Sequence, residues 1–179
     1  MQFFDNILSE VSITGSKISD EEVKELINLI TKAHHIFVAG MGRSGLMVKA
    51  FANRLMHLGY SVSVVGEISS PHTHNEDLFL ISSGSGETTS LVNQAKIAKN
   101  NGVKIALITA NPESSISQIA DTVLKIPVQS KNGIRETIQP MGSKFEQTTL
   151  FLYDSIVLNL MKQNGENEMS MKNRHADLE

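Results

Sequence analysis

Two kinds of hydrophobic pattern alternate along the chain. Short apolar runs bounded by turn residues predict five buried strands, at 36–39, 61–65, 78–82, 104–109 and 123–126. Around these runs, apolar residues recur every three to four positions, which predicts helices. The predicted helices are an N-terminal helix that ends at 14–16, a second that begins with a capping box of Ser19 and Glu22, one that ends at about Leu58, one through 91–98, a short one at 115–120 and a long one at about 143–161.

Strands that alternate with helices in this way predict an α/β fold. The strands should form a parallel five-stranded sheet with helices on both faces, which is a three-layer α/β/α sandwich with right-handed crossovers. In such folds, ligands bind beyond the carboxyl ends of the strands, at the point where the strand order reverses. The turns that follow the first and third strands should therefore lie at the binding edge of the sheet.

The turn at 83–88, Ser-Gly-Ser-Gly-Glu-Thr, connects the third strand to a helix. The first N–H groups of that helix have no partner within it, and the glycines let a ligand approach the backbone. Ser83, Ser85 and Thr88 add three hydroxyl donors, which predicts a phosphate-binding turn. The alternative is a simple helix cap, for which one such residue is enough. Glu87 stands where a nucleotide-binding P-loop has lysine, so we expect the phosphate to belong to a small metabolite.

A second glycine-rich turn follows the first strand. Gly40, Gly42 and Gly45 have the G-x-G-x-x-G spacing of dinucleotide-binding folds, and Glu67 lies near the place of their ribose-binding acid. A dinucleotide site would leave the turn at 83–88 without a role, and the chain has no room for a catalytic domain beside such a fold. We therefore favour the phosphate site at 83–88 over a dinucleotide site.

Composition narrows the class of protein further. The chain has 179 residues, 40% of them apolar, so we expect one domain with N-terminal helices at 3–33, the sheet and phosphate site at 36–163, and a tail at 164–179. The net charge of −3, with acids and bases mixed, argues against nucleic acid as a partner. The absence of cysteine excludes disulfides, thiolate nucleophiles and cysteine-ligated zinc. The start of the chain has no signal-peptide pattern and no apolar run approaches a membrane span, so we expect a soluble, cytoplasmic protein.

Longer segments resemble a known family. The turns at 40–45 and 83–88 together resemble the SIS (sugar isomerase) domain, whose fold is flavodoxin-like. Three further segments resemble the 6-phospho-3-hexuloisomerases: 54–59 (Arg-Leu-Met-His-Leu-Gly), 139–147 (Gln-Pro-Met-Gly-Ser-Lys-Phe-Glu-Gln) and 174–179 (Arg-His-Ala-Asp-Leu-Glu). The resemblance covers nearly the whole chain, and the last two of these segments are specific to that family.

This resemblance implies an isomerase that interconverts D-arabino-hex-3-ulose 6-phosphate and fructose 6-phosphate, a phosphorylated ketohexose. It also implies an enzyme without metal or organic cofactor, usually a homotetramer, that works beside hexulose-6-phosphate synthase in the ribulose monophosphate pathway of formaldehyde fixation. Two alternatives remain, another SIS isomerase of the arabinose 5-phosphate type and a non-catalytic sugar-phosphate-binding regulator. The chain has no helix-turn-helix segment with which such a regulator would read DNA, and it retains Glu146.

Glu146 is the candidate catalytic base. Moving a carbonyl to the neighbouring carbon needs a base for the proton between them, and donors that stabilise the enediolate. Glu146 stands in the first turn of the predicted last helix, after Pro140 and Gly142, where its side chain can face the strand ends. The alternative is an ordinary acid that the helix dipole favours. Glu87 is the reserve candidate, although a phosphate bound beside it would be repelled.

His57 is a candidate catalytic residue of a different kind. It follows Gly45 by 12 residues on one predicted helix, hence by about 18 Å, which is too far from its own subunit's turn. It could reach a neighbouring subunit's site if sites are shared across an interface, and His175 in the tail poses the same question. The alternative is a histidine that the dipole favours at the C-terminal end of a helix.

Three residues of the first turn, Gly42, Arg43 and Ser44, are candidate substrate-binding residues. Arg43 can hold substrate oxygens, or it can merely pair with a surface acid. His72 and His74 are interpreted as part of a solvated loop, because their short spacing supplies no closed set of metal ligands. No metal site is therefore predicted.

Overall fold

The computed structural model describes residues 2–128 and 137–178 of the chain. Its strands are β1 (Ile36–Gly40), β2 (Val62–Val64), β3 (Leu78–Ser82), β4 (Lys104–Thr109) and β5 (Thr122–Lys125). Its helices are α1 (Gln2–Gly15), α2 (Asp20–Lys32), α3 (Gly42–His57), α4 (Thr89–Asn100), α5 (Ser143–Asn164) and α6 (Glu168–Lys172). The five predicted strands are all present. The polar loop expected at 129–137 falls almost entirely outside the described residues.

The strands form one parallel sheet in the order β2-β1-β3-β4-β5. This is the flavodoxin-like order, and it differs from the order 3-2-1-4-5-6 that is typical of dinucleotide-binding sheets. The chain leaves β1 toward β2 on one side and returns to β3 on the other, so the order reverses between β1 and β3. Gly40 pairs with Ser82 in the register of these two strands, which places both predicted turns side by side at the reversal.

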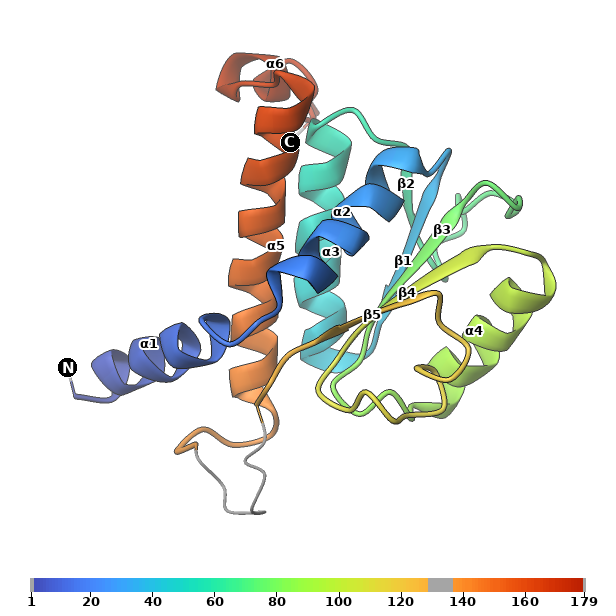
Figure 1. Cartoon of the computed structure of the whole chain (residues 1–179). Helices are drawn as coiled ribbons and strands as arrows, with labels where there is room; N and C mark the ends of the chain where they lie inside the picture. The colour runs from blue at the N-terminus through green and yellow to red at the C-terminus, as the bar shows by residue number, and fades with distance from the viewer. Residues whose placement is uncertain (1, 129–136, 179) are drawn as a thin grey trace.

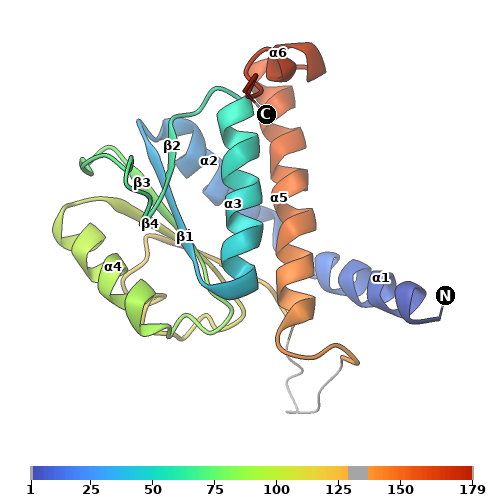
Figure 2. The same cartoon turned by 180° about the vertical axis from the view of Figure 1, so that it is seen from behind.

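Helices cover both faces of the sheet, which confirms the predicted three-layer sandwich (Figures 1 and 2). Successive side chains of a strand point to opposite faces. Val38 and Leu80 consequently pack with α2, α3 and α5, whereas Phe37 and Phe79 pack with α4. Ile116, from the connection between β4 and β5, completes the core on the α4 side. No described helix combines the length and apolar character needed to cross a membrane.

Helix α1 extends away from the body of the molecule, and among the described residues its C-terminal part lies against the lower half of α5 in Figure 1. Its predicted end at 14–16 is confirmed. The next helix begins as predicted, since Ser19 Oγ accepts from Glu22 N at 3.3 Å. The Glu22 carboxylate, however, accepts from Lys125 N at 2.8 Å, and so it connects α2 to β5.

The short helix predicted at 115–120 is wrong, because the structure has hydrogen-bonded turns there. Ser114 Oγ accepts from Ser117 N at 3.3 Å, and Ser117 Oγ donates to Asn111 O at 3.2 Å. Short hydroxyl side chains that bond the nearby backbone in this way compete with helical hydrogen bonds. In the tail, the structure has a helix that was not predicted. This helix, α6, begins at a capping box of Asn167 and Ser170, within a segment whose charged composition gave no helical pattern.

Candidate active site

The turn between β1 and α3 is held close to the sheet by two glycines. A Cβ at Gly45 would collide with the backbone of Gly40, so the start of α3 can lie directly against the end of β1. Gly42 begins α3 with a φ of 57°, in the left-handed region that glycine adopts without strain. Arg43 and Ser44 follow in the first turn of the helix. The G-x-G-x-x-G spacing therefore has a packing explanation that requires no dinucleotide.

Ser83 and Gly86 shape the second turn. Ser83 is buried, and its Oγ accepts from Gly86 N at 3.1 Å. Gly86 has a φ of 64°, and a Cβ there would collide with Ser114 Oγ. Asn111 Nδ2 donates to Ser85 O at 3.2 Å, which joins the turn to the segment after β4. The conformation of the turn is thus fixed by its own small residues and by the neighbouring connection.

Ser85 and Thr88 lie on the accessible side of this turn. Ser85 is exposed, and its Oγ accepts from Glu87 N at 3.2 Å, a bond that does not use the hydroxyl proton. Thr88 is the N-cap residue of α4, yet its side chain makes no capping hydrogen bond. The first N–H groups of α4 have no acceptor within the helix. Hydroxyl and backbone donors therefore converge at the N-terminus of a helix, which is the arrangement that binds an anion.

The first turn of α5 completes the site. Glu146 lies in this turn and is 8% exposed, and its Oε2 is 2.9 Å from Arg43 Nη1. The same Nη1 donates to Ser143 Oγ at 2.9 Å. A Cβ at Gly84 would lie 3.4 Å from the ring of Phe145, so the second turn also packs against α5. The structure therefore brings the predicted base, the predicted arginine and the serine-rich turn to one edge of the sheet.

Ser143 is a site residue that the sequence pattern did not reveal. Its Oγ accepts from Arg43 and donates to Pro140 O at 2.8 Å, so it connects the arginine to the chain that leads into α5. Gly142, the N-cap residue of α5, has a φ of 77°. The available signal was the position of Ser143 directly after Pro140 and Gly142, where a helix start projects its side chains toward the strand ends.

Glu87, the reserve candidate for the base, is engaged elsewhere. Its carboxylate accepts from Ser115 N and from Ser115 Oγ, both at 2.7 Å. These two hydrogen bonds hold the pKa of Glu87 below its usual value. The residue therefore fastens the start of α4 to the connection after β4, while Glu146 faces the arginine.

His57 lies at the opposite end of α3 from Arg43, as the distance argument predicts. It is 3% exposed, and its ring stacks on the exposed ring of His175 with centroids 5.0 Å apart. Arg174 donates to His57 O at 3.0 Å and to both carboxylate oxygens of Glu166, at 3.0 and 2.9 Å. These bonds anchor the C-terminal segment over the end of α3, which Figure 1 shows beside α6. Within one subunit, the structure does not bring either histidine to Glu146.

His72 and His74 lie in the loop before β3, with their rings edge-on and 5.5 Å apart. In the part of the chain that the structure describes, no group of three or more histidine, aspartate or glutamate side chains is placed to hold a metal ion. The nearby Asp77 accepts from His74 N at 2.6 Å, and its Oδ1 lies 3.6 Å from His34 Nδ1. These contacts lie at the amino ends of β1 and β3, away from Glu146.

Residues 29–158 of the chain match the family model of the SIS domain. The chain therefore belongs to the SIS domain family. Within this family, it is 46% identical to a Bacillus subtilis protein named 3-hexulose-6-phosphate isomerase, over 99% of this chain and 98% of that protein. It is 37% identical to a protein of the same name from Mycobacterium gastri, over 97% of this chain and 88% of the relative.

Solved structures agree with this assignment. A Methanococcus jannaschii protein, whose crystal structure was described as inferring a function of 3-hexulose-6-phosphate isomerase, superposes with a TM-score of 0.87. It is 34% identical, and the match covers the whole of both chains. The resemblance to 6-phospho-3-hexuloisomerases that the segments at 54–59, 139–147 and 174–179 indicate is thereby confirmed.

Proposed function

We propose that this protein is an isomerase that interconverts D-arabino-hex-3-ulose 6-phosphate and fructose 6-phosphate. One observation carries the proposal: a largely buried carboxylate, Glu146, faces the Arg43 guanidinium beside a helix N-terminus rich in donors. A base, a cation and an anion site are the groups that proton transfer on a sugar phosphate requires. Relatives named 3-hexulose-6-phosphate isomerase, similar over nearly the full chain, support this substrate among sugar phosphates.

The substrate phosphate binds at the turn at 83–88. The backbone N–H groups at the start of α4 and the hydroxyl groups of Ser85 and Thr88 donate to its oxygens. Ser83 contributes indirectly. Its buried Oγ accepts from Gly86 N, and this bond fixes the shape of the turn. Glu87 does not take up the donors of this turn with its carboxylate, since both of its carboxylate oxygens accept from Ser115.

Glu146 transfers the carbon-bound proton. Starting from fructose 6-phosphate, its carboxylate removes the proton from C3, and the electron pair of that bond forms the 2,3-enediolate. Glu146 then returns a proton to C2, while the O3 hydroxyl loses its proton and O2 gains one, so that the carbonyl moves from C2 to C3. Arg43 and Ser44 hold the two oxygens, because a guanidinium stabilises the developing negative charge. These steps use no metal and no organic cofactor.

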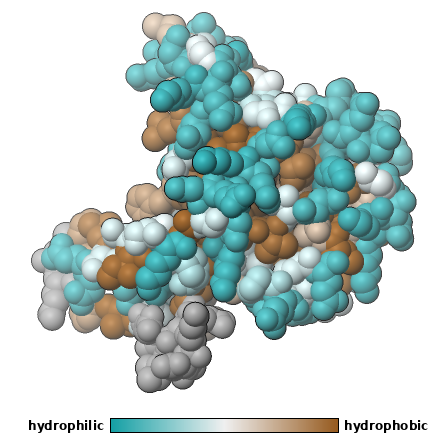
Figure 3. All heavy atoms as spheres, viewed as in Figure 1, coloured by the Kyte–Doolittle hydropathy of each residue, from teal (hydrophilic) through white to brown (hydrophobic). Residues whose placement is uncertain are grey.

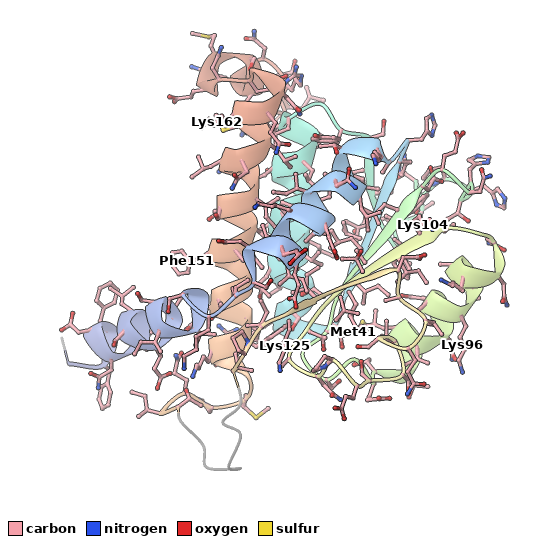
Figure 4. The ribbon with its side chains drawn as sticks, viewed as in Figure 1. Met41, Lys96, Lys104, Lys125, Phe151 and Lys162 are labelled. Carbon is pink, nitrogen blue, oxygen red and sulfur yellow. The ribbon has the colours of Figure 1, made fainter. Side chains whose placement is uncertain are left out.

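The protein assembles as a homo-oligomer, which we take to be a homotetramer. The angle between α1, α2 and α5 forms a groove of about 860 Å³. Exposed apolar side chains stand on α1 and on the adjoining flank of α5 (Figure 3), and Figure 4 shows Phe151 pointing into this angle. They are Phe3, Phe4, Leu8, Ile13, Phe151 and Leu158. A second copy can bury this surface by placing its own α1 in the groove, which is a self-complementary contact of the kind that twofold dimers use.

Assembly gives His57 a role. Since neither His57 nor His175 reaches the Glu146 of its own subunit, we propose that this end of α3 faces the site of a neighbour. His175 is the exposed member of the stacked pair, and the buried ring of His57 packs against it and supports it. We also propose that the protein is cytoplasmic and acts in the ribulose monophosphate pathway, as the resemblance implies.

Incubation with fructose 6-phosphate tests this function. The purified protein should produce the 3-ketose, seen by carbon-13 NMR as a ketone carbonyl signal beside the hemiketal signals of fructose 6-phosphate, and should leave unphosphorylated fructose unchanged. Arabinose 5-phosphate, offered separately, should give no ribulose 5-phosphate. Binding of fructose 6-phosphate without any conversion would instead support a regulator, and conversion of only arabinose 5-phosphate would support the other type of isomerase.

A further inference from the structure

Glu10, near the C-terminal end of α1, makes a set of contacts outside the site described so far. Its Oε2 accepts from Thr137 Oγ1 at 2.6 Å and from Gln139 Nε2 at 2.9 Å. Its Oε1 accepts from Ile138 N at 2.9 Å. One carboxylate therefore binds three donors from three consecutive residues, and these residues are more than a hundred positions away in the sequence. Such a multiple bond to a charged acceptor fixes a segment more firmly than a single neutral contact does.

The segment that Glu10 binds leads directly to the catalytic helix. Gln139 is followed by Pro140, whose carbonyl accepts from Ser143 N at 3.0 Å and from Ser143 Oγ at 2.8 Å. Ser143 Oγ in turn accepts from Arg43, which pairs with Glu146. An unbroken series of bonds thus runs from the carboxylate on α1 to the carboxylate proposed as the base.

The conformation of this segment needs such support. Met141 has a φ of 56°, unusual for a residue other than glycine, and Gly142 has a φ of 77°. Two consecutive residues in the left-handed region reverse the chain directly before α5, and a non-glycine residue persists there only when surrounding contacts fix it. The Met141 side chain is itself 91% exposed, so its own packing does not supply that support.

The charge state of Glu10 suits this role. Burial alone raises the pKa of its carboxyl, but the hydrogen bonds from Thr137, Gln139 and Ile138, together with the nearby Lys144 ammonium, outweigh burial and hold the pKa below its usual value. The ionised form therefore accepts all three donors near neutral pH.

We propose that Glu10 is a positioning residue, which through the segment at 137–142 sets the first turn of α5 so that Glu146 faces Arg43 and the bound sugar. This inference rests on the proposed isomerase function. Glu10 lies on α1, the helix that we place between subunits. Its contact with 137–139 therefore makes the geometry of the active site depend on the position of α1. A subunit whose α1 is displaced loses the alignment of its base.

Two readouts together test the proposal. We compare Glu10→Ala and Glu10→Gln with the parent protein and with Glu25→Ala, which removes an exposed acid from α2. The first readout is amide hydrogen exchange of the segment 137–146, which needs no substrate. The second is kcat and KM for fructose 6-phosphate, measured on protein whose oligomeric state sedimentation has verified.

We expect Glu10→Ala to speed exchange in this segment and to lower kcat about 10- to 100-fold, because small misplacement of a reacting group has effects of this size. KM should change less than about 3-fold, since the phosphate turn is not touched. Glu10→Gln, which keeps one acceptor oxygen at the same position, should fall between Ala and the parent and provides the test if Glu10→Ala does not fold. Glu25→Ala should match the parent.

Three results would overturn the inference. Parental exchange in Glu10→Ala would show that the carboxylate does not hold the segment. Faster exchange with parental kcat would show that the segment does not align the base. Equal losses in kcat for Glu10→Ala and Glu25→Ala would indicate a general effect of charge. A parent protein that does not isomerise the sugar phosphate would instead refute the proposed function, and the exchange readout would still report on the contact of Glu10.

Discussion

The two ends of α3 differ in what they offer a ligand. At its start, Gly42 and Arg43 lie beside the donor-rich turn before α4, and the guanidinium shares one nitrogen between Ser143 and Glu146. At its other end, His57 is covered by the C-terminal segment, which Arg174 anchors. Among the described residues, the first end has the carboxylate that we propose as the base and the donors that we propose as the anion site, whereas the second end has the two stacked histidines.

This difference teaches that one subunit holds only part of the proposed machinery. A helix of 16 residues spans about 24 Å, more than a sugar phosphate can bridge. The two ends can act on the same substrate only when different subunits contribute them. The exposed apolar surface of α1 and α5 is where we propose that a second copy binds.

The largest expected effect comes from breaking both ends in separate subunits. Glu146→Gln should lower kcat about 100-fold or more, as the loss of a general base does. His57→Ala should also lower kcat, because it removes the support of His175, which we place at a neighbour's site. Mixed and co-refolded, the two variants should regain up to about a quarter of parent activity, since half of random pairs are hybrids with one intact site of two. The measurement is turnover of the mixture against each variant alone.

Hybrids no more active than the separate variants, despite proven subunit exchange, would mean that both residues serve the same subunit's site. Repeating the mixing experiment with His175→Ala in place of His57→Ala distinguishes the roles of the two histidine rings. If His57 only supports its exposed neighbour, both substitutions complement Glu146→Gln to the same extent.

A smaller effect is expected at the donor-rich end. Ser85→Ala removes a hydroxyl donor that we place on the phosphate, and a hydrogen bond to a charged group of this kind corresponds to about a 10-fold rise in KM. The kcat should stay near the parent value, because the proton transfer is not touched. Equal affinity of the parent protein for fructose and fructose 6-phosphate would contradict the phosphate assignment.

The smallest effect should come from the anchor of the C-terminal segment. Arg174→Gln removes the paired bonds to Glu166 and the bond to the carbonyl of His57. Exposed ion pairs contribute less than about 1 kcal/mol, so the unfolding temperature should change little. Activity should nevertheless fall a few-fold, because His175 loses its fixed position. Lys172→Gln, an exposed charge on α6, is the matched control and should retain parent activity.

Much of the fold could be predicted from the sequence, because local patterns determine it. Apolar runs such as 78–82 and 104–109 are typical of buried parallel strands, and their bounds were predicted correctly. The prediction failed at 115–120, where the side-chain hydrogen bonds of Ser114 and Ser117 accompany separate turns and no continuous helix forms. Helix α6 in the charged tail was not predicted, since a helix of five residues leaves almost no periodicity to detect in the sequence.

The site could be predicted only in part. The glycine- and serine-rich turns can be recognised in the sequence, because close approach to the backbone requires small residues at neighbouring positions. The contacts of Arg43 with Ser143 and of Glu10 with 137–139 join positions a hundred or more residues apart, and no local pattern encodes them. The pairing of His57 with His175 is likewise a product of the folded tail.

The central claim is that Glu146, in the first turn of α5, removes the carbon-bound proton. The most direct test is exchange of that proton with solvent. In deuterium oxide, the parent protein should introduce deuterium at C3 of fructose 6-phosphate, observed by proton NMR as loss of the C3 signal. Glu146→Gln should fold and bind the sugar phosphate normally but exchange it at least about 100-fold more slowly, because an amide cannot accept the proton. Exchange at the parent rate in this variant would contradict the claim and place the base elsewhere.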